Sequence, residues 1–515
     1  MTERIIEPEF STSLKWQSVN VTTQVILQLC FIAVLARLIR TETHTSAEAF
    51  GVMAIALVVV GVIEMFAQVG IGPALIQNSN VRAEHQRTAF VFSLGLGIIF
   101  FVGTYLSAPY IASFYNQPLL TEVLRWIALS FIISGASVVP RSMLIKEMRF
   151  KSLFFCSSTA MIIGNLIVGL TLAYNGAGIW AYVIALLSQN TLLGIGYWIA
   201  APSPVGVFMD NKALREMVGY GGRSTVFNIL NYSASKIDTM VVGATTSNWT
   251  LTGLYDRSSY LMGLPVTVLG KLGDSVLFSG MSMMQDNRVR LKATVLSAIH
   301  GVILLVLPLT ALLIYRAEDF TVILLGTSYL EAVPIVTILF SCVALRSFIK
   351  IGDATMRATD HFTIGAVIKL CFLICVGVGA WRFMSESNVL RVAWVVAFST
   401  LAQSLAIAAW LIFSLKIRVN TLSSKVLPGI YLSATVVLGA LTINIIPIND
   451  YLNNAIEISE ISRGLYVLTH IITSLIFAFL LICAYPRIYD GGSPNMRRTF
   501  FGKLPAGKLK SRLTV

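Results

Sequence analysis

Residues 47–77, AEAFGVMAIALVVVGVIEMFAQVGIGPALIQ, decide the fold class of this chain. The stretch is apolar almost throughout, and its one charged residue between Phe50 and Gln68 is Glu64. A helix needs about 20 apolar residues to cross the ~30 Å hydrocarbon core of a bilayer, and this run has that length. We therefore predict a transmembrane helix at residues 50–68.

Runs of the same kind recur along the whole sequence. Of its 515 residues, 56% are hydrophobic and 12% are charged, and the mean hydropathy is +0.77, whereas a soluble domain carries about 25% charged residues. The sequence predicts an all-α integral membrane protein of about 14 transmembrane helices, at 19–39, 50–68, 88–108, 120–139, 153–174, 178–200, 224–244, 252–278, 293–315, 331–349, 362–381, 390–414, 427–447 and 464–485.

The net charge of +13 is distributed by loop. Lys and Arg gather in every second loop, around 82–87, 141–151, 212–223, 288–292, 350–357 and 416–425, and in the tail from Arg487 onward. Because basic loops stay on the cytoplasmic side, we expect both termini in the cytoplasm. The same residues suit anionic lipid headgroups, and we expect no nucleic-acid partner.

Motifs for catalysis or cofactor binding are missing from the sequence. The segment from Gly263 to Lys271 has the wrong glycine spacing for a phosphate-binding loop, and no Ser or Thr follows its Lys. The six cysteines all lie in predicted spans, where they behave as small apolar residues. We therefore expect no enzyme activity, no cofactor and no metal site.

Six blocks of sequence together point to a known family. They are residues 47–77, APYIASFYNQPLL (108–120), PRSMLIKEMRFK (140–151), NGAGIWAYV (175–183), GLYDRSSYLMGLPVTVL (253–269) and LLGTSYLEAVPIVTIL (324–339). In this order and at these helix positions, they resemble the polysaccharide exporters of the multidrug/oligosaccharidyl-lipid/polysaccharide (MOP) superfamily. The similarity extends over roughly residues 14–420.

The resemblance implies a fold of two six-helix lobes that form a V around a central cavity, with two C-terminal helices added. On this chain it places the N-terminal lobe at 1–201, a cytoplasmic linker at 202–222, the C-terminal lobe at 223–415, the added helices at 416–485 and a basic cytoplasmic tail at 486–515.

Within the superfamily, the blocks are most similar to Wzx-type flippases. This implies alternating-access transport of undecaprenyl-diphosphate-linked oligosaccharide repeat units across the bacterial inner membrane, for exopolysaccharide, capsule or lipopolysaccharide O-antigen. The implied partners are this lipid-linked substrate, membrane lipids, and the polymerase and glycosyltransferases of the same pathway. Tyr329, where the family pattern has Trp, and Asp256–Ser258, where it has Asn-Arg-Ala, blur which glycan is carried.

Two other functions stay open at this stage. A drug/cation antiporter of the same superfamily predicts a cavity dominated by carboxylates, whereas Lys236, Arg257 and Lys369 indicate an anionic ligand. An integral-membrane glycan polymerase or ligase predicts a sizeable external loop, and the longest loop here has about fifteen residues.

Charged residues within the spans are functional candidates, because each costs about 2.5–3.5 kcal/mol to insert at a helix centre. Lys236 lies on a helix with a polar cytoplasmic half, which predicts contact with the substrate diphosphate; the alternative is a structural lysine neutralised by Asp238 or another carboxylate. Glu64 and Asp238 are the candidates for ion coupling, since a desolvated carboxylate can exchange a proton. For Glu64 the alternative is an ion pair with Lys271 or Arg346.

The remaining candidates lie on two helices. Gln24 and Gln28 are one helical turn apart and form a polar stripe that suits sugar hydroxyls or, alternatively, a neighbouring helix. Arg37, Arg40 and Arg257 lie at outer helix ends, where guanidinium groups match the geometry of a diphosphate. The alternative for Arg37 and Arg40 is that they extend toward lipid headgroups.

Overall fold

The computed structural model describes residues 3–39, 45–67, 71–77, 81–204, 230–246, 248–273, 288–384 and 388–445, together with the single residues 206, 210 and 214. Every regular element in these ranges is a helix. Ten of the described helices are long and apolar enough to cross a membrane. The segments Thr327–Phe340 and Cys342–Ala358, bent by 42° between them, count as an eleventh if they form one span.

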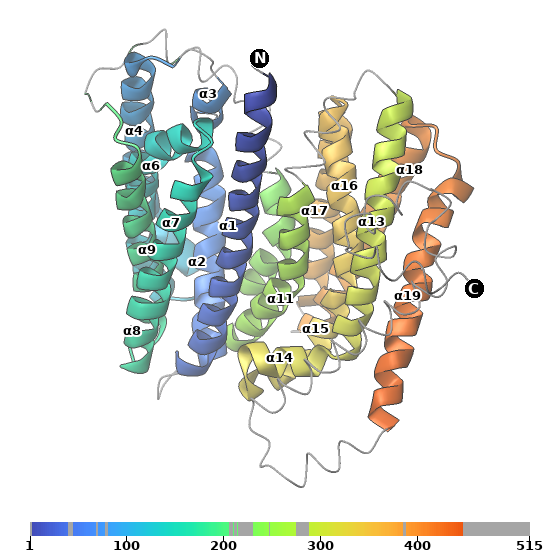
Figure 1. Ribbon diagram of the computed structural model, residues 1–515. Coiled ribbons are helices and arrows are strands. Elements are labelled where there is room, and N and C mark those ends of the chain that lie inside the picture. The colour runs from blue at the N-terminus through green and yellow to red at the C-terminus, as the bar shows by residue number, and fades with distance from the viewer. Residues whose placement is uncertain are drawn as a thin grey trace.

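The helices from the first part of the chain form what we call the N-terminal group. They are α1 (Glu3–Leu38), α2 (Ser46–Ala67), α3 (Ile71–Gln77), α4 (Ala83–Phe114), α5 (Leu119–Ile127), α6 (Leu129–Lys146), α7 (Phe150–Met161), a π-helical segment (Ile162–Gly169), α8 (Leu170–Tyr174) and α9 (Ile179–Ala200). In Figure 1, α4, α6, α7 and α9 lie on one side of α1 and α2.

The later helices form the C-terminal group. They are a helical segment at 230–245, α11 (Trp249–Gly273), α13 (Arg288–Tyr315), α14 (Ala317–Leu325), a 3-10 helix (Thr327–Ala332), α15 (Val333–Phe340), α16 (Cys342–Ala358), α17 (Phe362–Met384), α18 (Val389–Ser414) and α19 (Val419–Ile445). Most are upright in Figure 1, but the short α14 lies across the lower end of the molecule.

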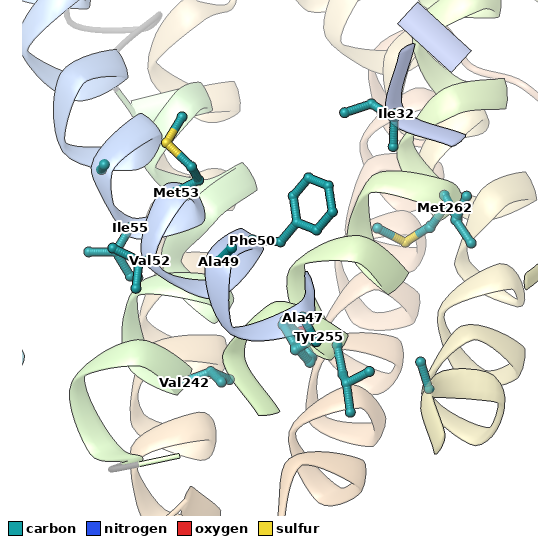
Figure 2. Packing of buried hydrophobic residues seen from close by; sticks show 14 of the residues in the cluster. Ile32, Ala47, Ala49, Phe50, Val52, Met53, Ile55, Val242, Tyr255 and Met262 are labelled. Carbon is teal, nitrogen blue, oxygen red and sulfur yellow. The ribbon is translucent and has the colours of Figure 1, made fainter. Parts of the chain in front are cut away.

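The two groups meet along α2, which packs closely against α11. Figure 2 shows Phe50, Met53 and Ile55 of α2 in the same buried cluster as Tyr255 of α11. A second contact joins the end of α1 to α14. Burial of this apolar surface holds the groups together inside the molecule, where lipid cannot compete for it.

Helices cover the described parts of the predicted spans, although only ten or eleven of them qualify as membrane-spanning, and two spans need correction. The sequence placed 141–151 and 350–357 in loops, but α6 continues to Lys146 and α16 to Ala358, so Arg141 and Lys350 are helical. Hydropathy ended these spans too early, because one face of each helix is polar and faces a cavity instead of lipid. The predicted span at 464–485 and the tail at 486–515 lie outside the described residues.

Candidate functional site

A cavity of about 1210 Å³ lies between the two helix groups. Residues from both groups line it, and its charged lining residues in the described part of the chain are five basic and three acidic. We call the lining residues before 201 the N-terminal wall and those from 230 onward the C-terminal wall. The two walls differ in chemistry.

The C-terminal wall is charged. Arg346, Lys350 and Asp353 are spaced four and three residues apart on α16, which places them on one face of that helix. Asp353 accepts a 2.6 Å bond from the ammonium group of Lys369 on α17, and both side chains are buried. This neutralises Lys369, whereas Arg346 makes no hydrogen bond or ion pair with the residues that the structure describes.

Lys236 and Asp238 also line this wall but differ in their surroundings. Asp238 is buried and accepts hydrogen bonds from the Tyr255 hydroxyl at 2.9 Å and from the backbone N–H of Thr239 at 2.8 Å. Lys236 is partly exposed, and within the described ranges no hydrogen-bond or ion-pair partner is found for its ammonium group. Its ammonium group therefore lines the cavity without an ion-pair partner among the described residues.

The polar residues of the N-terminal wall are mostly neutral. Besides Glu64 and Arg141, its polar members are Gln24, Gln28, Ser93, Ser134, Ser137, Ser142, Ser157, Gln189, Asn190 and Tyr197. Gln24 donates to the Asn20 side-chain oxygen at 3.0 Å, and Ser157 of α7 donates to the same oxygen at 2.8 Å. The amide of Gln24 is thereby oriented, with its own carbonyl oxygen left to accept a bond.

Glu64 lies on α2 where the two walls meet. It is partly exposed to the cavity, and Tyr232 lies nearby, with its hydroxyl donating to the Leu57 carbonyl at 3.3 Å. Arg346, one of the partners considered above for Glu64, lines the same cavity. The side chain of Lys271 lies outside the described residues.

Two of the predicted arginines, Arg37 and Arg257, lie away from the cavity lining. Arg37 donates to three backbone carbonyls, of Ala33, Val322 and Ile323, at 2.7, 3.0 and 2.8 Å. Arg257 is 3% exposed and donates to the carboxylate of Asp256 at 3.0 Å. Arg40 lies outside the described residues. The structure thus brings Gln24, Gln28, Glu64, Lys236 and Asp238 to one cavity and leaves Arg37 and Arg257 outside it.

Sequence reasoning missed several lining residues. Arg141 and Lys350 were assigned to loops, and Asp353 was not singled out at all. The helical spacing of Arg346, Lys350 and Asp353 was a usable signal, as was the series Ser134, Ser137 and Arg141 on α6.

Comparison with known proteins identifies the family. Residues 34–334, more than half of the chain, match the family described as "Polysaccharide biosynthesis protein". The chain belongs to this family. The teichuronic acid biosynthesis protein TuaB of Bacillus subtilis (strain 168) is 22% identical, over 94% of this chain and 97% of TuaB. The lipopolysaccharide biosynthesis protein WzxC of Escherichia coli (strain K12) is also 22% identical, over 65% of this chain and 66% of WzxC.

Solved structures confirm the fold of this family member. The lipid II flippase MurJ in its inward closed conformation has a TM-score of 0.70 at 13% identity, over 92% of this chain and 99% of MurJ. An inward-facing multidrug transporter of the MOP superfamily has a TM-score of 0.62 at 16% identity, over 76% of this chain and 94% of that protein. The family match confirms the predicted resemblance to polysaccharide exporters, and the solved structures confirm the multi-pass helical membrane fold.

Proposed function

We propose that the protein is a flippase that moves undecaprenyl-diphosphate-linked oligosaccharide repeat units across the bacterial inner membrane. The observation that supports this proposal is a single cavity with two chemically different walls, in a protein that belongs to a polysaccharide biosynthesis family. Names of relatives that refer to teichuronic acid and lipopolysaccharide support transport in glycan assembly.

The two walls match the two polar parts of such a substrate. A diphosphate carries about two negative charges, and Lys236 and Arg346 offer it cationic donors that have no ion-pair partner in the described structure. Charge-assisted hydrogen bonds of this kind are about twice as strong as neutral ones. Sugar hydroxyls both donate and accept, so the amides of Gln24 and Gln28 and the neighbouring serine hydroxyls suit the glycan.

Transport by alternating access requires the two helix groups to move relative to each other. We propose that they correspond to lobes at 1–201 and 223–415, arranged as a V of six helices each, with added helices at 416–485 and about 14 spans in total. Both termini then lie in the cytoplasm, as the basic loops predict. Glu64 and Asp238 are the proposed sites of ion coupling, because both are carboxylates at the cavity.

A drug/cation antiporter is the competing function within this fold. An organic cation prefers a cavity with excess negative charge, but the described lining carries five basic against three acidic residues. Asp238 and Asp353 are in addition already hydrogen-bonded, to Tyr255 and Lys369. The lining therefore favours an anionic substrate.

The test is flipping in reconstituted vesicles. Purified protein is inserted into liposomes that hold an undecaprenyl-diphosphate oligosaccharide on one leaflet, and its appearance on the other leaflet is followed with a membrane-impermeant glycosidase or lectin. We expect flipping far above that of protein-free vesicles, and no uptake of organic cations by the same vesicles. Cation uptake without lipid flipping would establish the antiporter instead.

A further inference from the structure

The end of the molecule at which α2 and α11 begin, which we call the Thr45 end, is closed by backbone contact. A Cβ atom added to Gly253 would lie 1.7 Å from the Ala47 carbonyl oxygen, and one added to Gly51 would lie 2.3 Å from that of Trp249. Only glycine allows two helices to approach so closely. The Thr45 and Thr250 hydroxyls lie 3.5 Å apart at the same place.

Arg37 makes a second contact between the groups at this end. Its guanidinium comes from α1 and donates to the Val322 and Ile323 carbonyls, which belong to the last turn of α14. The last carbonyls of a helix lie beyond its regular hydrogen-bond pattern, and they form its negative pole. The Val322 carbonyl also accepts the Gly326 N–H at 2.9 Å, so Arg37 is its second donor. Arg37 therefore caps a helix of the opposite group.

Arg257 makes a third contact. Its guanidinium lies 4.3 Å from the centre of the Phe50 ring of α2, while Asp256 beside it balances its charge. The lining of the cavity starts farther from the Thr45 end than these three contacts, at Gln28 of α1 and Ser259 of α11. The three contacts thus separate the cavity from the Thr45 end.

We propose that these contacts form a latch that must part in every transport cycle, with Arg37 as its removable cap. The latch explains why two arginines predicted to bind a diphosphate are engaged elsewhere: in this conformation the Arg37 donors and the contact of the Arg257 guanidinium with the Phe50 ring join the helix groups. When the groups separate at the Thr45 end, the α14 carbonyls lose their cap and the glycine contact opens. The inference rests on alternating access in the proposed function.

A reversible crosslink tests whether the latch must part. Thr45→Cys and Thr250→Cys are introduced together into a variant without the six native cysteines, because hydroxyls this close indicate side chains within disulfide reach. Oxidation should stop flipping and reduction should restore it in the same vesicles, so folding is controlled internally. Each single cysteine variant should be unaffected by oxidant. Full-rate flipping by the oxidised pair, or failure of the pair to crosslink, would overturn the proposal.

Labelling in lipid nanodiscs tests the residues without any substrate. Thr252→Cys is the reporter, since Thr252 is 0% exposed and outside the cavity lining. Arg37→Gln should raise its rate of reaction with a maleimide by about tenfold, equivalent to ~1.4 kcal/mol, and Gly51→Ala should act in the same direction. Arg37→Lys should raise it less, because the ammonium can still donate to α14.

Matched controls come from the same end and from an open glycine. Arg125 donates to the Tyr105 carbonyl at 3.5 Å within the N-terminal group, and Gly103 has no atom within 4 Å of an added Cβ. Arg125→Gln and Gly103→Ala should leave labelling unchanged. Equal labelling of Arg37→Gln, Gly51→Ala and these controls would contradict the latch. If the latch variants label faster but the unmodified protein flips no lipid, the proposed function is wrong and the latch stands.

Discussion

The two walls of the cavity differ in the chemistry of their side chains. The C-terminal wall holds six charged residues, whereas the N-terminal wall holds two, and its other polar members are amides and hydroxyls set among apolar residues. Charges inside a membrane protein are costly to bury, so their concentration on one wall makes that wall the proposed site for the diphosphate. Neutral polar groups cost less free energy to bury, and in the proposed function they form hydrogen bonds with the sugar hydroxyls. If the walls bind different parts of the substrate, they contribute separately to transport.

The largest effect is expected from breaking the ion pair on the C-terminal wall. Asp353→Ala or Lys369→Met alone leaves one buried charge without its partner and should cost about 3–5 kcal/mol of stability. The double variant should cost much less than the sum of the two, because neither charge remains. Thermal unfolding of the four proteins in detergent measures this coupling. Additive losses would show that the 2.6 Å contact is not a coupled pair.

The next effect concerns the unpaired cation on the same wall. Lys236→Ala removes a charge-assisted contact worth about 1.5–3 kcal/mol and should slow flipping by about 10- to 100-fold. Lys236→Arg should keep partial activity because it keeps the positive charge. Vesicle flipping measures both, with expression and unfolding temperature as checks on folding.

The matched control for Lys236 is Lys292. Lys292 also lies on a helix, α13. Its ammonium group, however, donates to the Lys416 carbonyl at an exposed position away from the cavity. The Lys292→Ala protein should flip the lipid at the normal rate. Normal flipping by Lys236→Ala, or loss of the folded protein, would show that Lys236 is structural.

The place of Lys236 in the cavity lining could be predicted from sequence, because a lysine deep in an apolar run is costly unless it faces a polar space. The fold class and most spans followed from hydropathy for the same reason, since the bilayer imposes one length and one polarity on each helix. Arg141 and Lys350 escaped because amphipathic helix ends look like loops to a hydropathy average. Helical spacing is the better guide at such ends.

The contact of Arg37 with α14 could not be predicted from sequence, for a different reason. Its acceptor Val322 is 285 residues away in sequence, and the contact exists only once α14 lies across the end of α1. A guanidinium that caps a helix has the same local sequence as one that binds a phosphate. Only tertiary structure separates these two uses.

A smaller effect is expected on the N-terminal wall. Gln28→Leu removes neutral hydrogen bonds worth about 0.5–1.5 kcal/mol, so flipping of the glycan-bearing lipid should fall by about 2- to 10-fold. Flipping of undecaprenyl diphosphate without sugars should not change, because that molecule has no hydroxyls to bind. Lys236→Ala should impair both lipids. If Gln28→Leu slows both equally, the walls do not divide the substrate as proposed.

The smallest effect is expected from Glu64→Gln, since it concerns the driving force and not the binding of the substrate. Moving one charge across 100 mV is worth about 2.3 kcal/mol, so outward movement of a diphosphate with about two negative charges gains on the order of 4–5 kcal/mol when the inside is negative. In the proposed mechanism the membrane potential alone can then drive flipping, and protons or sodium ions carried by Glu64 on the return step add to it. Collapsing the potential with valinomycin and potassium at equal pH should slow flipping by the unmodified protein. Glu64→Gln should abolish only the response to a pH gradient and keep the response to potential, because it removes a titrating group from the N-terminal wall while the cations opposite stay in place. If neither gradient changes the rate, transport is passive and drawn by consumption of the substrate on the far side, and Glu64 has no coupling role.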